Sequence, residues 1–300
     1  MNRLFRKMTT RPVWWWETRR RYPIRSRFAQ LPPQPVRDGG IPFVVLTTPA
    51  GFHDALWAAW SWHRFLREAG CVLQIAVDGA LSAPDLEAAR RLFPGIAVDS
   101  PLWACREVCA LAPECERFFT GYPTGRKLAL LLALSRRGPL LYSDFDVLAF
   151  SRPHELLRAI AANTACYFAE EVDGARDPAV VGSANRLGLD LLPRFNSGFL
   201  FLPQASLPIE LAARILAAQP PSWTTWYAEQ TVLSIMLRQS GACALPPARY
   251  VISNRRQFYW EEDVDYSAIA ARHFTGTVRH VLYQYGMPRI LDQCKDGSHE

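Results

Sequence analysis

Residues 139–146 read PLLYSDFD, a short apolar run of strand length that ends in two carboxylates one residue apart. In open α/β sheets, ligands bind at the carboxyl ends of the strands. Where the backbone turns after a strand, Asp144 and Asp146 can converge on one ion, and such hard oxygen ligands suit Mg²⁺ or Mn²⁺ bridging a diphosphate. A bare Asp-x-Asp is also common in solvated turns, so the preceding strand is what favours a metal site.

Strand and helix patterns alternate on both sides of this run. The sequence predicts strands at 41–48, 71–77, 164–169, 199–202 and 250–253. It predicts helices at 52–69, 83–93, 126–137, 153–162 and 229–239. Strands that alternate with helices indicate an α/β fold with a mostly parallel sheet covered on both faces. No linker or internal repeat divides this body, so we expect one domain.

Composition and charge separate a basic N-terminal arm from this body. The chain of 300 residues is 49% hydrophobic and 21% charged, which is typical of a globular protein and argues against general disorder. Residues 1–30 carry a net charge of +8 and the whole chain +6, so the remainder carries −2. Prolines at 32, 33 and 35 and Asp38-Gly39-Gly40 mark the junction.

The arm has three interpretations. Its consecutive residues Trp14, Trp15 and Trp16 pack onto the domain, they contact an anionic membrane surface, or, least favoured, the arm attracts nucleic acid. The sequence shows no signal-peptide core and no apolar run near the ~18 residues of a membrane span. The seven cysteines include no CxxC pair, which favours reduced thiols. We therefore expect a cytoplasmic protein, with peripheral contact at the inner face of the membrane as the alternative, and no nucleic-acid partner.

Two later segments carry polar groups that suit a ligand site. The stretch 195–202 reads FNSGFLFL, in which we expect an Asn-Ser-Gly turn to open an apolar strand. The stretch 272–280 reads RHFTGTVRH. There the imidazole of His273 could complete a metal shell, Gly276 would let the backbone approach a phosphate, and Arg279 would add charge toward it. Taken alone, the first segment could be a simple tight turn, and a surface histidine is the favoured explanation of the second.

In this order, the segments resemble the GT-A glycosyltransferases, most closely the retaining group of lipooligosaccharide galactosyltransferases and glycogenin. That group carries a DxD after a strand, an FN(A/S)G strand, an acid-Gln pair on a helix and HxxGxxK near the end. The matching segments here are Asp144–Asp146, Phe195–Gly198, Glu229–Gln230 and His273–Arg279. The resemblance implies a GT-A-type, Rossmann-like domain at 41–285, between an arm at 1–40 and a tail at 286–300.

The resemblance also implies an activity and the residues that carry it out. The enzyme would move a hexose from a nucleotide diphosphate sugar, most simply a UDP-sugar, to an acceptor hydroxyl with retention. Mn²⁺ or Mg²⁺ would be held by Asp144, Asp146 and His273. Gln230 would lie beneath the anomeric carbon and Glu229 would bind sugar hydroxyls. The other substrate-binding residues that it implies are Thr47 at the nucleotide, Lys127 and Asp144 near donor phosphate, ribose or sugar, Asn196 and Ser197 at the sugar, and Gly276 and Arg279 at the diphosphate.

Three departures and two alternatives remain. Glu229 stands where the group more usually has Asp, Arg279 where it has Lys, and no Pro-Trp follows. A DxD-type phosphohydrolase and a non-catalytic nucleotide-sugar binding module are the alternative functions. The acceptor would be a glycan, glycolipid or other hydroxyl compound bound by the region after residue 165, for which the candidate aromatic residues are Trp223, Trp226 and Trp260. An inverting enzyme would need a carboxylate base, for which the candidates are Asp173, Asp177, Glu261, Glu262 and Asp263.

Overall fold

The computed structural model describes residues 23–122, 124–170, 175–218, 225–252, 264–276 and 279–295. Several residues singled out in the sequence lie outside this part of the chain: Trp14, Trp15, Trp16, Asp173, Trp223, Trp260, Glu261, Glu262 and Asp263. No helix among the described residues is both long enough and apolar enough to span a bilayer.

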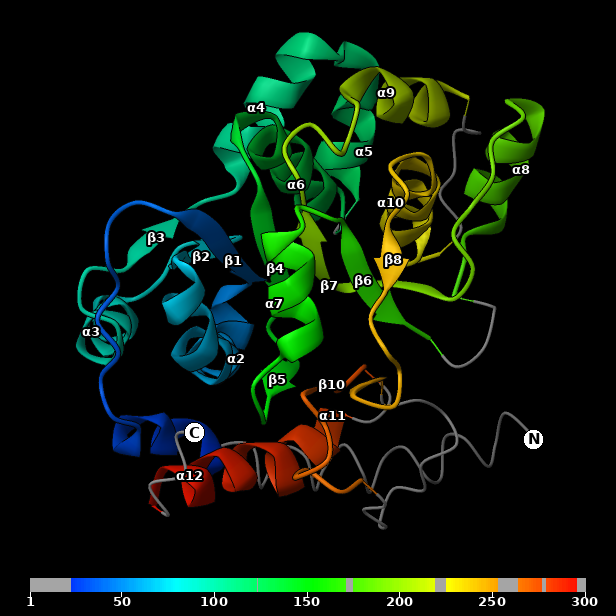
Figure 1. The fold of residues 1–300 in the computed structure, drawn as a ribbon. Helices are drawn as coiled ribbons and strands as arrows, with labels where there is room; N and C mark the ends of the chain where they lie inside the picture. The colour runs from blue at the N-terminus through cyan, green and yellow to red at the C-terminus, as the bar shows by residue number, and fades with distance from the viewer. Residues whose placement is uncertain are drawn as a thin grey trace, which may run out of the picture.

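A seven-stranded sheet forms the centre of the molecule, with the strand order β3-β2-β1-β4-β7-β6-β8 (Figure 1). Its strands are β1 (Ile41–Thr47), β2 (Cys71–Val77), β3 (Ala97–Asp99), β4 (Leu140–Asp144), β6 (Cys166–Ala169), β7 (Phe195–Leu202) and β8 (Cys243–Ala244). The strands β3, β2, β1 and β4 run parallel, whereas β7 is antiparallel to both β4 and β6. The sheet is mostly parallel, as the sequence predicts.

A second, three-stranded sheet follows the order β5-β10-β9. It consists of β5 (Val147–Ala149), β9 (Tyr250–Ile252) and β10 (Ala271–His273). Because β5 begins directly after Asp146, this small sheet continues the chain from the carboxyl end of β4. Its antiparallel pairing of β10 with β5 brings residues more than 120 positions apart in the sequence side by side.

Helices cover both faces of the central sheet (Figure 1). One apolar core contains the helices α2 (Phe52–Leu66), α3 (Ala83–Leu92), α7 (His154–Ala161) and α12 (Met287–Lys295). The other contains α4 (Leu102–Leu111), α5 (Glu116–Gly121), α6 (Gly125–Arg137), α8 (Pro178–Arg186), α9 (Ile209–Ala217) and α10 (Ala228–Gln239). Side chains of β1 alternate between them, since Phe43 and Val45 join the first core and Val44 the second. This arrangement confirms the predicted single α/β domain.

The β7 segment differs from its predicted form. The sequence indicates a turn at Asn196-Ser197-Gly198, but these residues lie inside β7, which begins at Phe195. The pairing of β6 with β7 shifts register here, because Phe168 faces Asn196 while the preceding Tyr167 faces Leu200. The turn-forming residues therefore produce a bulge in the strand, where a small, polar sequence can leave the ladder and direct side chains into a site.

Both ends of the described chain pack against the domain. Ile24, Phe28 and Leu31 belong to the first apolar core, and the indole of Trp60 donates to Pro32 O at 2.9 Å. Residues of α12 belong to the same core. The boundaries at residues 40 and 285 stay predictions. All seven cysteines are free thiols.

Candidate active site

Asp144, Asp146 and His273 meet where the two sheets join. Asp144 is the last residue of β4, and Asp146 follows it in the turn that leads into β5. His273 ends β10, whose register places it opposite Val147, and Phe274 N donates to Asp146 O at 2.9 Å. One ligand atom from each of the three side chains lies within 4.8 Å of the other two. The pairing of β10 with β5 is thus what brings the histidine to the Asp-x-Asp turn.

The donor set of this cluster suits a hard divalent cation, because it offers two carboxylates and one imidazole. Asp146 is buried, and its carboxylate faces His273 Nε2 at 3.2 Å and Arg279 at 2.5 Å. Burial opposes ionisation of Asp146, but Arg279 and then His273 outweigh it and hold the pKa of this carboxyl well below its usual range. Asp146 is therefore an anion at any physiological pH, as a metal ligand must be.

The FNSG segment of β7 supports His273. His273 Nδ1 lies 3.0 Å from Asn196 Oδ1, which also accepts a hydrogen bond from Gly198 N at 2.9 Å. Because that oxygen can only accept, Nδ1 donates to it, which leaves Nε2 as the ring nitrogen that faces Asp146 and that would bind a metal. A buried partner that fixes the tautomer of a histidine is typical of metal sites. Asn196 thus positions the imidazole, and its amide nitrogen donates to Glu170 at 3.0 Å.

Lys127 is the buried cation at the centre of the neighbouring polar cluster. Its ammonium donates to Asp144 Oδ1 at 3.1 Å, to Ser197 O at 2.9 Å and to Ser197 Oγ at 3.0 Å, and it faces Glu229 Oε1 at 3.5 Å. Burial lowers the pKa of Lys127, but Asp144 and Glu229 more than compensate, so the net shift is upward. The helix α6 therefore supplies a fixed positive charge beside the Asp-x-Asp turn.

Glu229 lies in the first turn of α10 and is almost fully buried. Burial raises the pKa of Glu229 to about 7, with Lys127 opposing the rise and Asp144 adding to it. Its Oε2 accepts from Ser197 Oγ at 3.3 Å, whereas its buried Oε1 accepts no hydrogen bond from the described residues. This oxygen has the Lys127 ammonium 3.5 Å away but no closer donor, so it can still accept a hydrogen bond from a ligand hydroxyl.

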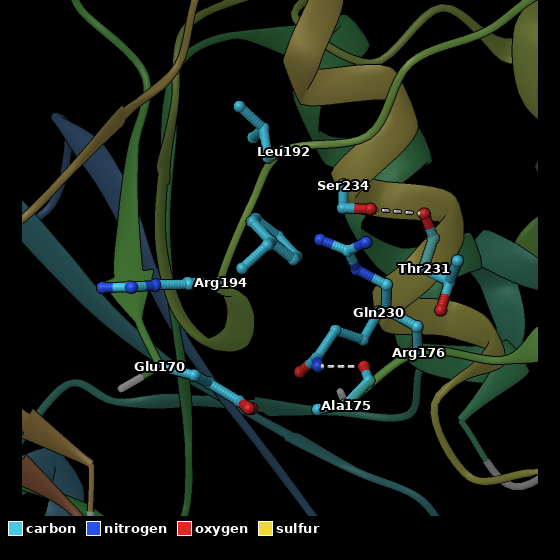
Figure 2. Close-up of a pocket in the computed structure, with 9 residues that line it drawn as sticks. Glu170, Ala175, Arg176, Leu192, Arg194, Gln230, Thr231 and Ser234 are labelled. Carbon is cyan, nitrogen blue, oxygen red and sulfur yellow. Dashed lines mark hydrogen bonds between the residues drawn. The ribbon is translucent and has the colours of Figure 1, made fainter. Parts of the chain in front are cut away.

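Gln230 lines a pocket beside this cluster (Figure 2). Its Oε1 accepts from Ser197 N at 3.1 Å, and its Nε2 donates to Ala175 O at 2.8 Å. Glu170 and Arg176 lie in the same pocket, where Figure 2 shows the Arg176 side chain extending toward Ser234. The amide of Gln230 is thus held between β7 and the loop that precedes α8.

Three further residues expected at the site lie at its margins: Thr47, Arg279 and Gly276. Thr47 is buried at the end of β1, and Arg279 contacts both Asp146 and the ring of Phe145. Gly276 is exposed, and a Cβ built on it would meet no described atom within 4 Å. The other site residues expected from the sequence lie in the cluster or on elements that border it.

Two residues of the site were not anticipated. Tyr142 lies two positions before Asp144 on the same face of β4, and its hydroxyl donates to the Asp144 carboxylate. Glu170 follows β6 and bonds to Asn196, and burial raises the pKa of its carboxyl. The two-residue period of a strand could have identified Tyr142. Nothing local in the sequence marks Glu170, since its position depends on β6 pairing with β7.

Two further candidates from the sequence can be placed. Asp177 is fully buried and caps α8, accepting from Ala179 N and Val180 N, and it also accepts from Thr225. Because both carboxylate oxygens accept these structural hydrogen bonds, Asp177 does not supply the base for an inverting reaction. Trp226 is 69% exposed just before α10, which leaves its indole open to solvent near the start of that helix.

Comparison with known proteins assigns the fold. No protein-family model matches the sequence, and neither does any curated protein. Among solved structures, mouse xyloside xylosyltransferase 1 in its apo form matches with a TM-score of 0.52 at 14% identity, over 80% of this chain and 99% of that one. The galactosyltransferase LgtC in complex with donor and acceptor sugar analogs matches with a TM-score of 0.53 at 14% identity, over 85% of this chain and 96% of that one. The chain has the GT-A fold of these glycosyltransferases.

Proposed function

We propose that this protein is a metal-dependent glycosyltransferase, which moves a hexose from a UDP-sugar to an acceptor hydroxyl with retention of configuration. The observation that carries the proposal is the convergence of Asp144, Asp146 and His273 at one point. A fold likeness alone would leave the activity open, because one fold hosts many functions. A carboxylate–imidazole site at the carboxyl edge of the sheet gives that fold a specific chemistry.

Asp144, Asp146 and His273 would hold Mn²⁺ or Mg²⁺. When bound, the dication would neutralise charge on the diphosphate of the donor and on the nucleoside diphosphate that leaves. Arg279, which already faces the Asp146 carboxylate, would donate to the phosphate oxygens from its planar guanidinium. Lys127, which pairs with Asp144, would add a second fixed positive charge.

The sugar would lie against Lys127, Ser197 and Glu229. Among the described residues, Glu229 Oε1 has the Lys127 ammonium at 3.5 Å and no closer donor, so a sugar hydroxyl would give this buried acceptor a full hydrogen bond. Asn196 would act through His273, whose ring it orients, and its amide nitrogen, which donates to Glu170, would also contact the sugar. Retention is consistent with an amide, Gln230, beside this position, because an amide cannot deprotonate the acceptor as an inverting mechanism requires.

The test is binding and hydrolysis of a panel of nucleotide sugars by the full chain, first with Mn²⁺ and then with EDTA. We expect one donor to bind and turn over only with the metal, and Asp146→Ala to abolish both. The stereochemistry of the transferred sugar, followed by NMR of the product, tests retention separately. If no nucleotide sugar binds while simple phosphomonoesters release phosphate, the protein is a phosphohydrolase and the proposal is wrong.

A further inference from the structure

A buried carboxylate joins the two ends of the described chain, which are drawn in blue and red in Figure 1. Asp54 lies in the first turn of α2 and is fully buried. Its Oδ1 accepts a hydrogen bond from Arg25 Nε at 2.7 Å, and its Oδ2 accepts one from the hydroxyl of Tyr283 at 2.9 Å. Arg25 belongs to the basic N-terminal arm, whereas Tyr283 lies in the helical turn η5 (Leu282–Gly286). Asp54 therefore links the arm to the C-terminal helical segment.

The same C-terminal segment carries Arg279. That residue begins α11 (Arg279–Val281), which runs directly into η5. Side chains four positions apart lie on one face of a helix, so Arg279 and Tyr283 are neighbours one turn apart. Arg279 Nη2 pairs with Asp146, but its buried Nε has no hydrogen-bond partner in the part of the chain that the structure describes. One donor of the guanidinium is thus uncommitted, and nearby charges influence where the group points.

The charge of Asp54 reaches this guanidinium. Burial opposes the positive charge of Arg279, but Asp146, and after it Tyr283 and Asp54, outweigh burial and raise the pKa of Arg279. Two carboxylates therefore attract one guanidinium, Asp146 in the metal cluster and Asp54 behind Tyr283. Arg25 offsets the second of them, because it forms an ion pair with Asp54 in which the arginine side chain is only 13% exposed. This pair leaves Arg279 directed at Asp146.

Arg25 also supports the site from a second side. Its Nη2 donates to the backbone oxygen of Ala50 at 2.6 Å, in the turn that follows β1. A Cβ built on Gly51 in this turn would lie 3.4 Å from the ring of Phe145, so the turn packs against the residue between the two aspartates. The guanidinium of Arg279 lies 4.9 Å from the centre of that ring. Arg25 thus holds the turn on which this aromatic ring rests.

We propose that Arg25 is a positioning residue of the active site, which neutralises Asp54 so that Arg279 stays directed at the diphosphate of the donor. This inference rests on the proposed function, and it adds a residue of the N-terminal arm to the residues that support the site. Without Arg25, the buried charge of Asp54 would lack its cation, which is costly, and Arg279 would turn toward it. The phosphate oxygens would then lose a charge-assisted hydrogen bond.

The experiment measures the dissociation constant of UDP for the full chain with Mn²⁺ by isothermal titration calorimetry. Arg25→Met keeps the aliphatic stem and removes the charge. We expect UDP to bind roughly 10- to 100-fold more weakly, which corresponds to one charge-assisted hydrogen bond. Mn²⁺ without nucleotide should bind at least as tightly as to the wild type, because a guanidinium drawn to Asp54 no longer competes for Asp146. A general collapse of the site would instead weaken both.

Two further variants test the mechanism. Adding Asp54→Asn to Arg25→Met removes the uncompensated charge, so we expect the affinity for UDP to return to within about threefold of the wild type. No such rescue follows if Arg25 only packs the arm onto the domain. Tyr283→Phe keeps both charges and removes the hydrogen bond to Asp54, which should weaken UDP binding about threefold. This milder variant provides the test if Arg25→Met does not fold.

Arg64→Met is the matched control. Arg64 is a buried arginine in the last turn of α2, and its guanidinium bonds to Phe150 O at 3.3 Å and to Gln293 Oε1 at 2.8 Å. Because neither partner belongs to the metal cluster, the variant should lower the unfolding free energy in urea and leave the affinity for UDP unchanged.

The outcomes separate the inference from the proposed function. If Arg25→Met folds and binds UDP as the wild type does, the inference is wrong while the proposed function stands. The same holds if Asp54→Asn does not rescue UDP binding, or if Tyr283→Phe, tested where Arg25→Met does not fold, binds UDP as tightly as the wild type. If the wild type does not bind UDP, the proposed function fails together with the inference.

Discussion

The imidazole of His273 lies directly over the backbone of Gly198. A Cβ built on Gly198 would approach two ring atoms of His273 to well under 3.0 Å, closer than real Cβ atoms come to any neighbour. The glycine of the FNSG segment is therefore required by the histidine and not by its own backbone conformation. This relationship links two segments 75 positions apart and explains why both belong to one site.

The first prediction follows from this contact. Gly198→Ala should displace the ring of His273 and break its bond to Asn196, so we expect the affinity for Mn²⁺ to fall roughly 10- to 100-fold, the usual cost of disturbing a partner of a metal ligand. This affinity can be measured by electron paramagnetic resonance, which detects the free Mn²⁺. Gly182→Ala is the control, because an added Cβ in α8 would make only an ordinary 3.6 Å contact with Arg186. Unchanged Mn²⁺ affinity in Gly198→Ala would exclude His273 as a ligand.

The second prediction concerns the buried charge of Lys127. Lys127→Met keeps the length of the side chain but leaves Asp144 and Glu229 without their cation. Breaking a buried pair in this way costs about 3–5 kcal/mol of unfolding free energy, which urea denaturation can measure. At a pH above the pKa of Glu229, adding Glu229→Gln should restore part of this stability, since one of the two uncompensated charges is removed, while donor turnover stays lost. A double variant no more stable than Lys127→Met would show that Glu229 does not depend on this lysine.

The sequence predicts the N-terminal half of this fold better than the site that the fold builds. Strand β1 and the Asp-x-Asp turn were predictable, because a continuous β-branched run and a strand that ends in acids are local signals. The contact of His273 with Asp146 depends on β10 pairing with β5, so only a family resemblance, and no local pattern, could suggest it. The sequence predicts a turn where the structure has a bulge in β7, because Asn, Ser and Gly favour both and only the pairing with β6 decides between them. Pairings between distant segments are what a local pattern does not encode.

The third prediction is a pH dependence of stability that arises from Glu229. Its pKa in the folded protein is raised to about 7 from an ordinary value of 4.5, so between these values the folded state binds more protons than the unfolded state. Stability must then fall as pH rises through this window. The glutamine in Glu229→Gln does not titrate, so the variant lacks this loss of stability. We expect the unfolding free energy of the variant minus that of the wild type to rise by roughly 2 kcal/mol between pH 5 and pH 8. Urea titrations of both proteins at several pH values measure this difference, and parallel pH profiles would contradict the raised pKa.

The fourth prediction separates the hydroxyl of Tyr142 from its ring. The ring is fully buried and lies 4.7 Å from the Lys127 ammonium, and Tyr142→Phe keeps both of these contacts. What the variant loses is the hydrogen bond to Asp144, which leaves Lys127 alone to orient that carboxylate. We expect the affinity for Mn²⁺ to fall up to about tenfold, at the low end of the cost of removing a partner of a metal ligand. The unfolding free energy should fall by only about 1 kcal/mol.

Tyr250→Phe is the matched control, because Tyr250 in β9 of the small sheet is equally buried. Its hydroxyl donates to Glu155 in α7 at 3.1 Å and accepts from Leu156 N at 3.3 Å. It should cost a similar amount of stability and leave Mn²⁺ binding unchanged. Equal Mn²⁺ affinities for the two variants would mean that the Tyr142 hydroxyl only packs the strand. A loss confined to Tyr142→Phe would show that β4 orients the metal ligand at its end through the residue two positions before it.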